Sequence, residues 1–345
     1  MKPSAGLNLF SLKHKIPLSL TFELTYDCPL SCAHCYLSKK EEGKGKYLNT
    51  KEAIKILKMF KKAKTMSVAF TGGEPLLRKD LPEICLAAKA LNFDFSLYTS
   101  LFPATYSILK RLKDCGLKKL EVSLYGEEKE HEAVTRKKGS YRLVLKNLKL
   151  AKKLGFKIKL KTPLTGLNPK GPYLVKKMAL KNGFSFSADP LLTPKNDGHE
   201  LPLHVKAKER DIENLVLSEN RGLKEILNQN ESETAPLCSA GFNTASVNPY
   251  GELFPCLQFP YSFGNLRKKD FFSLWNSRRA ENFRKKLYLK PKACLNCDLD
   301  KYCSFCPGLG YIKGDLSKIN RLTCFIALCS KKARAKRPLV FKNKK

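Results

Sequence analysis

Apolar and polar residues alternate in six short runs along the first half of the chain. In the first run, residues 18–26, the side chains of Leu18, Leu20, Phe22 and Leu24 fall on one side. Similar runs follow at 67–73, 93–99, 120–126, 156–162 and 184–190. Because successive side chains of a strand point to opposite faces, this period of two predicts six β-strands.

Longer segments with helical spacing separate the predicted strands. Residues 49–64 place Ile54, Leu57 and Phe60 on one face, and Asn49 or Thr50 precedes them as an N-cap. Further helices are predicted at about 80–91, 104–115, 140–154 and 170–182. Strands that alternate with helices indicate a parallel sheet with right-handed crossovers.

The second face of most predicted strands is polar, which is unusual for a buried parallel sheet. We therefore expect a sheet curved around a wet lumen, as in a partial (β/α)6 TIM-like barrel. Antiparallel strands with one face in solvent are the alternative. Four polar side chains of this face are candidates for contact with substrate or cosubstrate: Glu23, Lys159, Lys161 and Asp189.

Composition divides the chain of 345 residues into parts. We expect a barrel over residues 14–190, a linker over 191–233, a small cysteine-rich domain over 234–330 and a basic tail over 331–345. The linker lacks strand patterns, and residues in its second half are expected to form surface helix.

The net charge is +34, and most of the positive charge comes from lysine. A charge this large attracts nucleic acid, acidic membrane surfaces or acidic substrates. The lysines are scattered along every predicted helix, however, which favours a solvated surface over one binding patch. No apolar run is long enough to span a bilayer, and the N-terminus lacks an apolar signal core, so we expect a cytoplasmic protein.

Thirteen cysteines in a reducing compartment indicate metal binding or chemistry more than disulfides. Cys28, Cys32 and Cys35 follow the first predicted strand within eight residues. A structural zinc site needs four ligands, and His34 is the one candidate for the fourth. A [4Fe–4S] cluster held by three thiolates would instead keep one iron open.

The Cys-x3-Cys-x2-Cys spacing after a strand resembles the signature of radical S-adenosylmethionine (radical SAM) enzymes. In that family the open iron binds S-adenosylmethionine, and His34 matches the position that usually carries an aromatic residue. The segment at 72–75 resembles the family's Gly-Gly-Glu-Pro element, in which Gly72 and Gly73 admit close approach to a ligand and Glu74 accepts a hydrogen bond from the ligand's ammonium group. Ser123 and Arg136 match weaker positions that contact the cosubstrate. Thr99 matches a further loop, but Ser100 and Leu101 depart from it, which puts a role for that loop in doubt.

The C-terminal third carries a second set of cysteines, whose order resembles the SPASM domain with its two auxiliary [4Fe–4S] clusters. The resemblance implies that Cys238, Cys256 and Cys306 hold the first auxiliary cluster, with an iron open to another ligand. It implies a second cluster on Cys294, Cys297, Cys303 and Cys324, although Cys329 is an alternative to Cys324. Zinc is the other interpretation of the paired cysteines. Cys85 and Cys115 lie in predicted helices and are expected to be buried apolar residues.

The resemblance implies an enzyme that reductively cleaves S-adenosylmethionine to make a 5′-deoxyadenosyl radical for hydrogen abstraction. Relatives modify peptides, proteins or small cofactor precursors, and the net charge favours an acidic substrate if it acts in recognition. An electron donor such as flavodoxin or ferredoxin is expected, and nucleic acid is not required. The alternative is a basic zinc- or iron-binding protein that binds nucleic acid without catalysis.

Overall fold

Six parallel strands form the curved wall of a partial barrel in the computed structural model, which describes residues 4–38, 45–219, 236–316 and 318–336. They are β1 (Ser19–Thr25), β2 (Ser67–Gly72), β3 (Asp94–Thr99), β4 (Lys119–Ser123), β5 (Lys157–Pro163) and β6 (Ser185–Asp189). Each pairs in parallel with the next in sequence order. All six strand predictions and the barrel architecture are confirmed.

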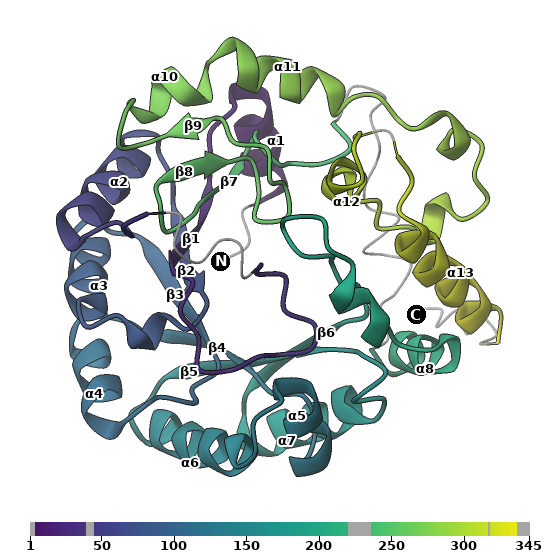
Figure 1. Ribbon diagram of the computed structural model, residues 1–345, viewed down its shortest axis with the longest axis horizontal. Helices are drawn as coiled ribbons and strands as arrows, with labels where there is room; N and C mark the ends of the chain where they lie inside the picture. The colour runs from purple at the N-terminus through teal and green to yellow at the C-terminus, as the bar shows by residue number, and fades with distance from the viewer. Residues whose placement is uncertain (1–3, 39–44, 220–235, 317, 337–345) are drawn as a thin grey trace, which may run out of the picture.

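Helices cover the outside of this wall (Figure 1). They are α2 (Thr50–Lys62), α3 (Leu81–Ala90), α4 (Tyr106–Asp114), α5 (Glu128–Thr135), α6 (Ser140–Lys153) and α7 (Gly171–Asn182). Asn49 is the N-cap of α2: its side chain accepts from the Glu52 amide, and the Glu52 carboxylate accepts from the Asn49 amide. The helix buries Ile56 with Leu57 and Phe60, whereas Ile54 is only half-buried.

The apolar core lies between the helices and the outer face of the strands, with Phe22 and Phe70 fully buried at its centre. The inner face of β1 is polar but also enclosed, since Glu23 is only 5% exposed and Thr25 only 1%. This polar interior matches the lumen that the strand pattern predicts.

The cysteine-rich region continues the same sheet. β7 (Thr244–Val247) pairs in parallel with β1, with Ser19 opposite Thr244, and β8 (Glu252–Phe254) and β9 (Gly264–Asn265) follow as antiparallel strands. The helices α10 (Phe271–Trp275) and α11 (Arg278–Lys286) lie beyond them, next to α1 (Ala5–His14) in Figure 1. Two short 3-10 turns, η4 (Lys292–Cys294) and η5 (Asp300–Tyr302), and α12 (Pro307–Ile312) lead to α13 (Arg321–Ala335).

Two predicted boundaries need correction. The predicted linker contains η3 (Leu201–Val205) and α8 (Glu209–Glu219). Helix was expected there, but on the surface, whereas Ile212 and Leu215 of α8 are buried in a second small core with Cys329 of α13. The predicted basic tail is wrong at its start, because residues 331–335 belong to α13 and Ala333 is fully buried there. Residues 337–345 of the tail and 220–233 of the linker lie outside the described residues.

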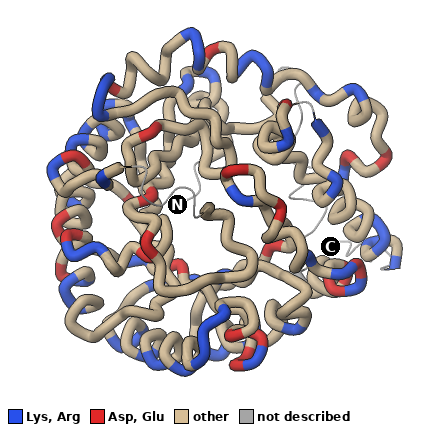
Figure 2. The backbone as a smooth tube through the Cα atoms, viewed as in Figure 1, with Lys and Arg blue, Asp and Glu red and all other residues tan. Residues whose placement is uncertain are grey.

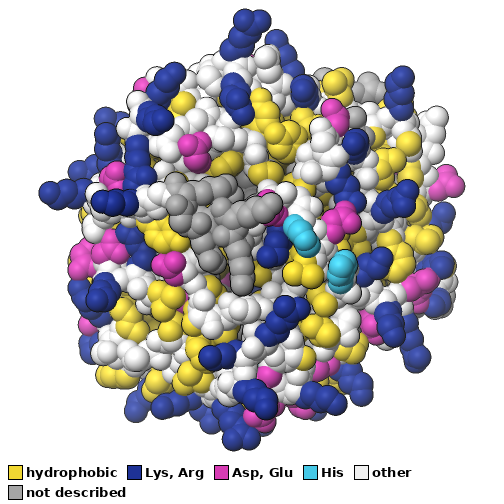
Figure 3. Space-filling model, in the orientation of Figure 1, with side chains coloured by type: hydrophobic (Ala, Val, Ile, Leu, Met, Phe, Trp, Pro, Cys, Tyr) yellow, Lys and Arg dark blue, Asp and Glu magenta, His cyan; other side chains and the backbone are white. Residues whose placement is uncertain are grey.

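Charge is distributed as the scattered lysines predict. Lys and Arg positions are spread around the outer helices, while several Asp and Glu positions border the central opening (Figure 2). The face in Figure 3 likewise carries separate basic side chains and no single basic patch. In the described part of the chain, no helix is long and apolar enough to cross a membrane.

Candidate active site

The three N-terminal cysteines lie in the segment that follows β1, at the carboxyl end of the strand. Cys28 is exposed, and Cys32 and Cys35 are half-buried. Burial raises the pKa of the Cys28 thiol to about 11, and burial with the nearby Cys35 and Cys28 thiols raises the pKa of Cys32 to about 12. The three thiols therefore lie close enough to oppose one another's ionisation, and a cationic iron core would reverse that effect.

The Gly72-Gly73 turn at the end of β2 is hydrogen-bonded to residues 25–27, where the cysteine segment begins. The Gly73 amide donates to the Thr25 carbonyl (2.7 Å) and the Glu74 amide to the Asp27 carbonyl (2.8 Å). A Cβ on Gly73 would lie 2.3 Å from the Asp27 oxygen, and one on Gly72 2.1 Å from the Thr25 oxygen. The glycines are thus needed for close packing of two backbone turns, a reason that the sequence interpretation, which invoked a ligand, did not include.

The Glu74 carboxylate is fully buried and accepts hydrogen bonds from residues at the end of β3. Its Oε1 accepts from Thr99 Oγ1 (2.7 Å), and its Oε2 accepts from the Ser100 amide (2.8 Å) and Ser100 Oγ (2.5 Å). The Leu76 amide also donates to Oε1 (3.2 Å). The loop at 99–101, whose role the sequence leaves in doubt, thus binds through Ser100 the carboxylate that the sequence assigns to the cosubstrate.

Ser123, His34 and Tyr125 meet beside Cys32. The Tyr125 hydroxyl accepts a hydrogen bond from Ser123 and donates one to the Cys32 sulfur. The His34 ring packs edge-on against Tyr125, with 5.1 Å between ring centroids, and burial lowers the pKa of His34 to about 4. His34 is therefore neutral at pH 7, and its buried Nδ1 has no hydrogen-bond partner in the described residues.

The end of α5 also docks onto the cysteine segment. The Ala33 amide donates to the Val134 carbonyl (2.8 Å), and the Ser31 amide to the Thr135 carbonyl (3.4 Å). Arg136 follows directly and is exposed, with its backbone in the left-handed region at φ 57°. The structure thus brings Arg136 to the edge of the site and His34 and Ser123 into its wall.

A loop that the sequence assigned to the linker holds the cysteine segment from a third direction. The Asn196 amide donates to the Tyr36 carbonyl (2.9 Å), and Ser38 Oγ donates to Asp197 Oδ2 (2.6 Å). The Ser38 amide donates to Asn196 Oδ1 (3.2 Å). A loop of polar residues carries no periodicity, so only its Asp and Asn content could have suggested such a role.

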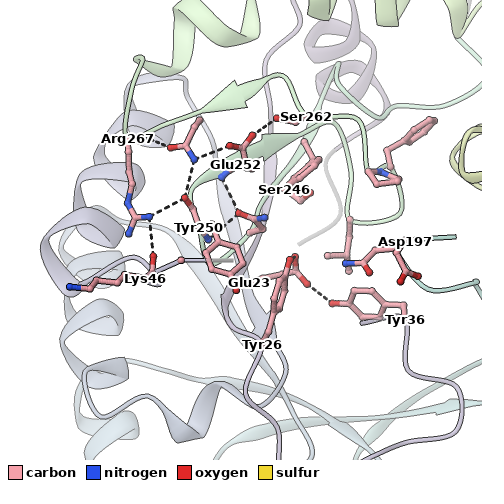
Figure 4. A pocket seen from close by; sticks show the side chains of 18 residues that line it. Glu23, Tyr26, Tyr36, Lys46, Asp197, Ser246, Tyr250, Glu252, Ser262 and Arg267 are labelled. Atoms are coloured by element: carbon pink, nitrogen blue, oxygen red, sulfur yellow. Dashed lines mark hydrogen bonds between the residues drawn. The ribbon is translucent and has the colours of Figure 1, made fainter. Parts of the chain in front are cut away.

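A cavity of about 660 Å³ opens between the cysteine segment and strands β7 to β9 (Figure 4). Glu23 projects into it from β1 and accepts from Tyr36 Oη (2.6 Å) and Tyr26 Oη (3.2 Å). The opposite wall comes from the C-terminal region, and its members include Ser246, Asn248, Tyr250, Glu252, Leu257, Phe259 and Arg267. Its volume falls in the range of ordinary ligand pockets.

The position of this cavity relates the two cysteine sets. Tyr36 follows Cys35 in sequence, and Leu257 follows Cys256, and both line the cavity. A molecule in the cavity would therefore lie between the N-terminal thiols and the first set of C-terminal thiols. Tyr36 and the strand β8 wall were not among the sequence candidates; of the four lumen residues suggested, only Glu23 lines this cavity.

The C-terminal cysteines fall into two groups. Electrostatic coupling links Cys238, Cys256 and Cys306 with one another, and it links Cys294, Cys297, Cys303 and Cys324 with one another. These are the two sets that the resemblance implied. Cys329 is fully buried among the side chains of α8 and couples instead to Glu209 and Glu213, so the structure places it apart from both groups. Cys85 and Cys115 are buried in the main core.

A zinc ion and a [4Fe–4S] cluster require different distances between their thiol ligands. A tetrahedral zinc ion with Zn–S bonds of about 2.3 Å draws its sulfurs to about 3.8 Å from one another. No three His, Cys, Asp or Glu side chains among the described residues are arranged to hold one metal ion. A [4Fe–4S] cube, which takes one thiolate at each iron, accepts thiols that are grouped but farther apart.

A buried cation lies among aromatic rings of the C-terminal region. Arg284 is 3% exposed, its Nε donates to the Gly241 carbonyl (2.5 Å), and its guanidinium lies 4.8 Å from the centre of the Trp275 ring. Its Nη1 and Nη2 have no hydrogen-bond partner in the described part of the chain. The rings of Phe242 and Phe263 also face this guanidinium, so cation–π contacts offset part of the cost of burying the charge.

Comparison with known proteins finds two family models in separate parts of the chain. A family model of the radical SAM superfamily matches residues 22–170, and one of an iron–sulfur cluster-binding domain, SPASM, matches residues 238–298. The chain is 27% identical over 336 residues to the antilisterial bacteriocin subtilosin biosynthesis protein AlbA of Bacillus subtilis (strain 168), which covers 90% of this chain and 69% of that protein.

Two solved structures share the fold at low sequence identity. The structure of anSMEcpe with bound AdoMet superposes with a TM-score of 0.71 at 18% identity and covers 93% of this chain and 94% of that chain. The structure of Streptococcus suis SuiB bound to precursor peptide SuiA superposes with a TM-score of 0.70 at 18% identity and covers 92% of this chain and 79% of that chain.

Proposed function

Since the chain is a radical SAM enzyme with a C-terminal SPASM domain, we propose that its substrate is a peptide or protein side chain, held in the cavity between Tyr36 and Leu257. The observation that carries the proposal is the position of that cavity between the N-terminal thiols and the first C-terminal group. AlbA is named for the biosynthesis of a bacteriocin, and SuiB was solved with a precursor peptide, which favours a peptide over a small cofactor precursor.

Cys28, Cys32 and Cys35 hold the cluster of the radical SAM site in this proposal. When bound, that cluster and S-adenosylmethionine supply reductive cleavage of the carbon–sulfur bond, which gives methionine and a 5′-deoxyadenosyl radical. The chain fixes the three thiols by hydrogen bonds from three directions: the Gly73 turn, the end of α5 and the loop at 196–197. Three ligands leave the fourth position for the cosubstrate.

The cosubstrate contacts are assigned to residues at the carboxyl edge of the strands. Gly72, Gly73 and Glu74 shape the turn beside Cys28, and the Ser123–Tyr125 pair and His34 form the wall beside Cys32. Arg136 reaches the edge from the end of α5. Sites of TIM-like barrels form at this edge, which supports the assignment.

The SPASM domain binds auxiliary iron–sulfur clusters, and we assign two. The first rests on Cys238, Cys256 and Cys306 and has only three cysteine ligands, so one iron is open to another group. The second rests on Cys294, Cys297, Cys303 and Cys324. The isolation of Cys329 in the α8 core supports Cys324 as the fourth ligand.

The cavity wall bears on the chemistry of the substrate. Its ionisable side chains include three carboxylates, of Glu23, Asp197 and Glu252, and two cations, Lys46 and Arg267, of which Arg267 is paired with Glu52 (2.8 Å). An acidic side chain at the reacting position would meet these carboxylates. We therefore assign the substrate residue as uncharged or basic, in contrast to the acidic substrate that the net charge suggested.

Anaerobic reconstitution tests the function. With dithionite and S-adenosylmethionine the protein should release 5′-deoxyadenosine, and a variant that carries Cys28→Ala, Cys32→Ala and Cys35→Ala should release none while keeping about eight of about twelve irons. The matched control is Cys85→Ala, a buried core cysteine that should keep both iron and product. If the triple variant still forms 5′-deoxyadenosine, the assignment of the site is wrong.

A further inference from the structure

A run of apolar side chains is exposed on the surface beside the second C-terminal thiol group. Tyr288 is 48% exposed, Leu289 66% and Leu295 61%, and Leu295 directly follows Cys294. The backbone in this segment is ordered by turns, since the Leu289 amide donates to Lys286 (3.2 Å) and the Leu295 amide to Lys292 (3.2 Å). Apolar side chains that are exposed in a defined conformation characterise interaction surfaces.

The segment that carries these apolar side chains, residues 285–301, is also basic. Residues 285–301 carry five lysines and two aspartates, Asp298 and Asp300, and Asp300 is already paired with Lys290 (2.8 Å). Charge per residue is therefore nearly twice the average of a chain that is itself very basic. Lys285, Lys286, Lys292 and Lys301 are all exposed. Exposed apolar side chains in a basic segment complement a partner whose contact surface combines apolar and acidic side chains.

The same segment contains the thiols of the second group. Cys294 and Cys297 are half-exposed. The two C-terminal groups are neighbours, because Cys303 belongs to the second group and Cys306, three residues later, to the first. Three extended residues span at most about 11 Å. A partner seated on this surface is thus brought close to the segment that carries Cys294 and Cys297.

The proposed reaction needs an electron from outside the protein, which indicates the class of partner that docks here. Cleavage of the sulfonium carbon–sulfur bond to methionine and a 5′-deoxyadenosyl radical consumes one electron, which no side chain of the protein supplies. We infer that the surface of Tyr288, Leu289 and Leu295, with the lysines of the same segment, docks a small acidic electron-transfer protein that delivers this electron. The inference rests on the proposed function, because it assumes that the adjacent cysteines hold an auxiliary cluster.

A reduced flavodoxin is a suitable acidic probe for the holoenzyme. Two variants alter the surface without touching a cysteine: Leu289→Asp, and a triple charge reversal of Lys285, Lys286 and Lys292 to Glu. Their matched controls are Leu180→Asp on α7, which is 72% exposed, and Glu at the exposed α6 lysines Lys146, Lys149 and Lys153. The readouts are binding of flavodoxin, iron content, and 5′-deoxyadenosine formation driven either by flavodoxin or by dithionite.

We expect both surface variants to weaken flavodoxin binding and to slow the flavodoxin-driven reaction by about tenfold, with iron content and the dithionite-driven reaction unchanged. Added salt should weaken binding in the wild type more than in the charge-reversal variant. Equal behaviour of surface and control variants would overturn the docking site, as would a wild type that dithionite activates but flavodoxin neither binds nor reduces. A wild type that is silent with dithionite would instead refute the proposed function.

Discussion

Substituting Gly73 with alanine tests how the structure builds the base of the cysteine segment. The backbone of Gly73 is not in the left-handed region, so alanine there destabilises the fold only through steric clash. The new Cβ would lie 2.3 Å from the Asp27 oxygen and 2.6 Å from the Tyr26 oxygen, and ordinary contact begins at 3.4 Å. The two turns must therefore separate by about 1 Å, which is enough overpacking to cost about 1–3 kcal/mol.

That separation also breaks hydrogen bonds. The bonds from the Gly73 and Glu74 amides, at 2.7 and 2.8 Å, would lengthen beyond the useful range, at a cost of about 1 kcal/mol each. The total is about 3–5 kcal/mol, which for a chain of this size lowers the midpoint of thermal unfolding by about 4–7 °C. Because Asp27 precedes Cys28, the variant should also lose iron from the N-terminal site.

Thermal unfolding followed by circular dichroism, with iron analysis of the same anaerobic preparation, measures both effects. Gly6→Ala is the matched control: Gly6 lies in α1, and an added methyl group there would have nothing within 4 Å, so the change should be neutral or slightly stabilising. A Gly73→Ala protein that unfolds within a degree or two of the wild type, with full iron, would refute the close-packing argument.

Three further predictions follow from particular contacts. Glu74→Gln turns an amide NH2 toward donors at Thr99 and Ser100, so it should lower the free energy of unfolding by about 2–4 kcal/mol and weaken S-adenosylmethionine binding in equilibrium dialysis, whereas Glu83→Gln, at an exposed surface pair, should change neither. Burial lowers the pKa of His131 to about 4, below the unfolded value of about 6.5. Above pH 6.5 the ring is neutral in the folded and the unfolded chain, so it does not make stability depend on pH; as the pH falls from 6.5 toward 4, only the unfolded chain takes up the proton, and the folded state loses stability. In urea unfolding, the free energy of unfolding of the wild type should therefore fall by about 1.3 kcal/mol more than that of His131→Gln between pH 7.5 and 5.5. Equal losses in the two proteins would contradict burial as the cause. Cys324→Ser should remove up to four irons and Cys329→Ser none, and the reverse result would reassign the second auxiliary cluster.

The barrel could be predicted because its strands carry their own pattern. The period-two runs locate β1 to β6 within three residues, and the Asn49–Glu52 capping box begins α2 where the sequence places it. The pattern fails where burial is not periodic. The sequence suggests a basic tail after residue 330 because the last turns of α13 carry Lys332 and Arg334, although Lys332 pairs with Glu209 across the helix interface.

The site was predictable where chemistry fixes residue type and spacing. The resemblance of the cysteine order to the SPASM domain anticipated the two C-terminal groups, because thiol ligands must recur in the order that a cluster requires. Contacts between distant loops could not be predicted in this way. The Ser100–Glu74 hydrogen bonds, the hold of Asn196 and Asp197 on the cysteine segment, and the Tyr36 side of the cavity depend on tertiary arrangement, for which short polar loops give no periodic signal.

The central claim is that three thiolates near the N-terminus leave one iron for S-adenosylmethionine. Electron paramagnetic resonance of the dithionite-reduced protein tests it directly, most simply in a variant in which Cys238, Cys256, Cys294 and Cys297 are replaced by alanine so that the N-terminal signal stands alone. Adding S-adenosylmethionine should shift the g-values of that signal, and Cys32→Ala in the same background should abolish it. A signal that is unchanged by the cosubstrate would contradict the account.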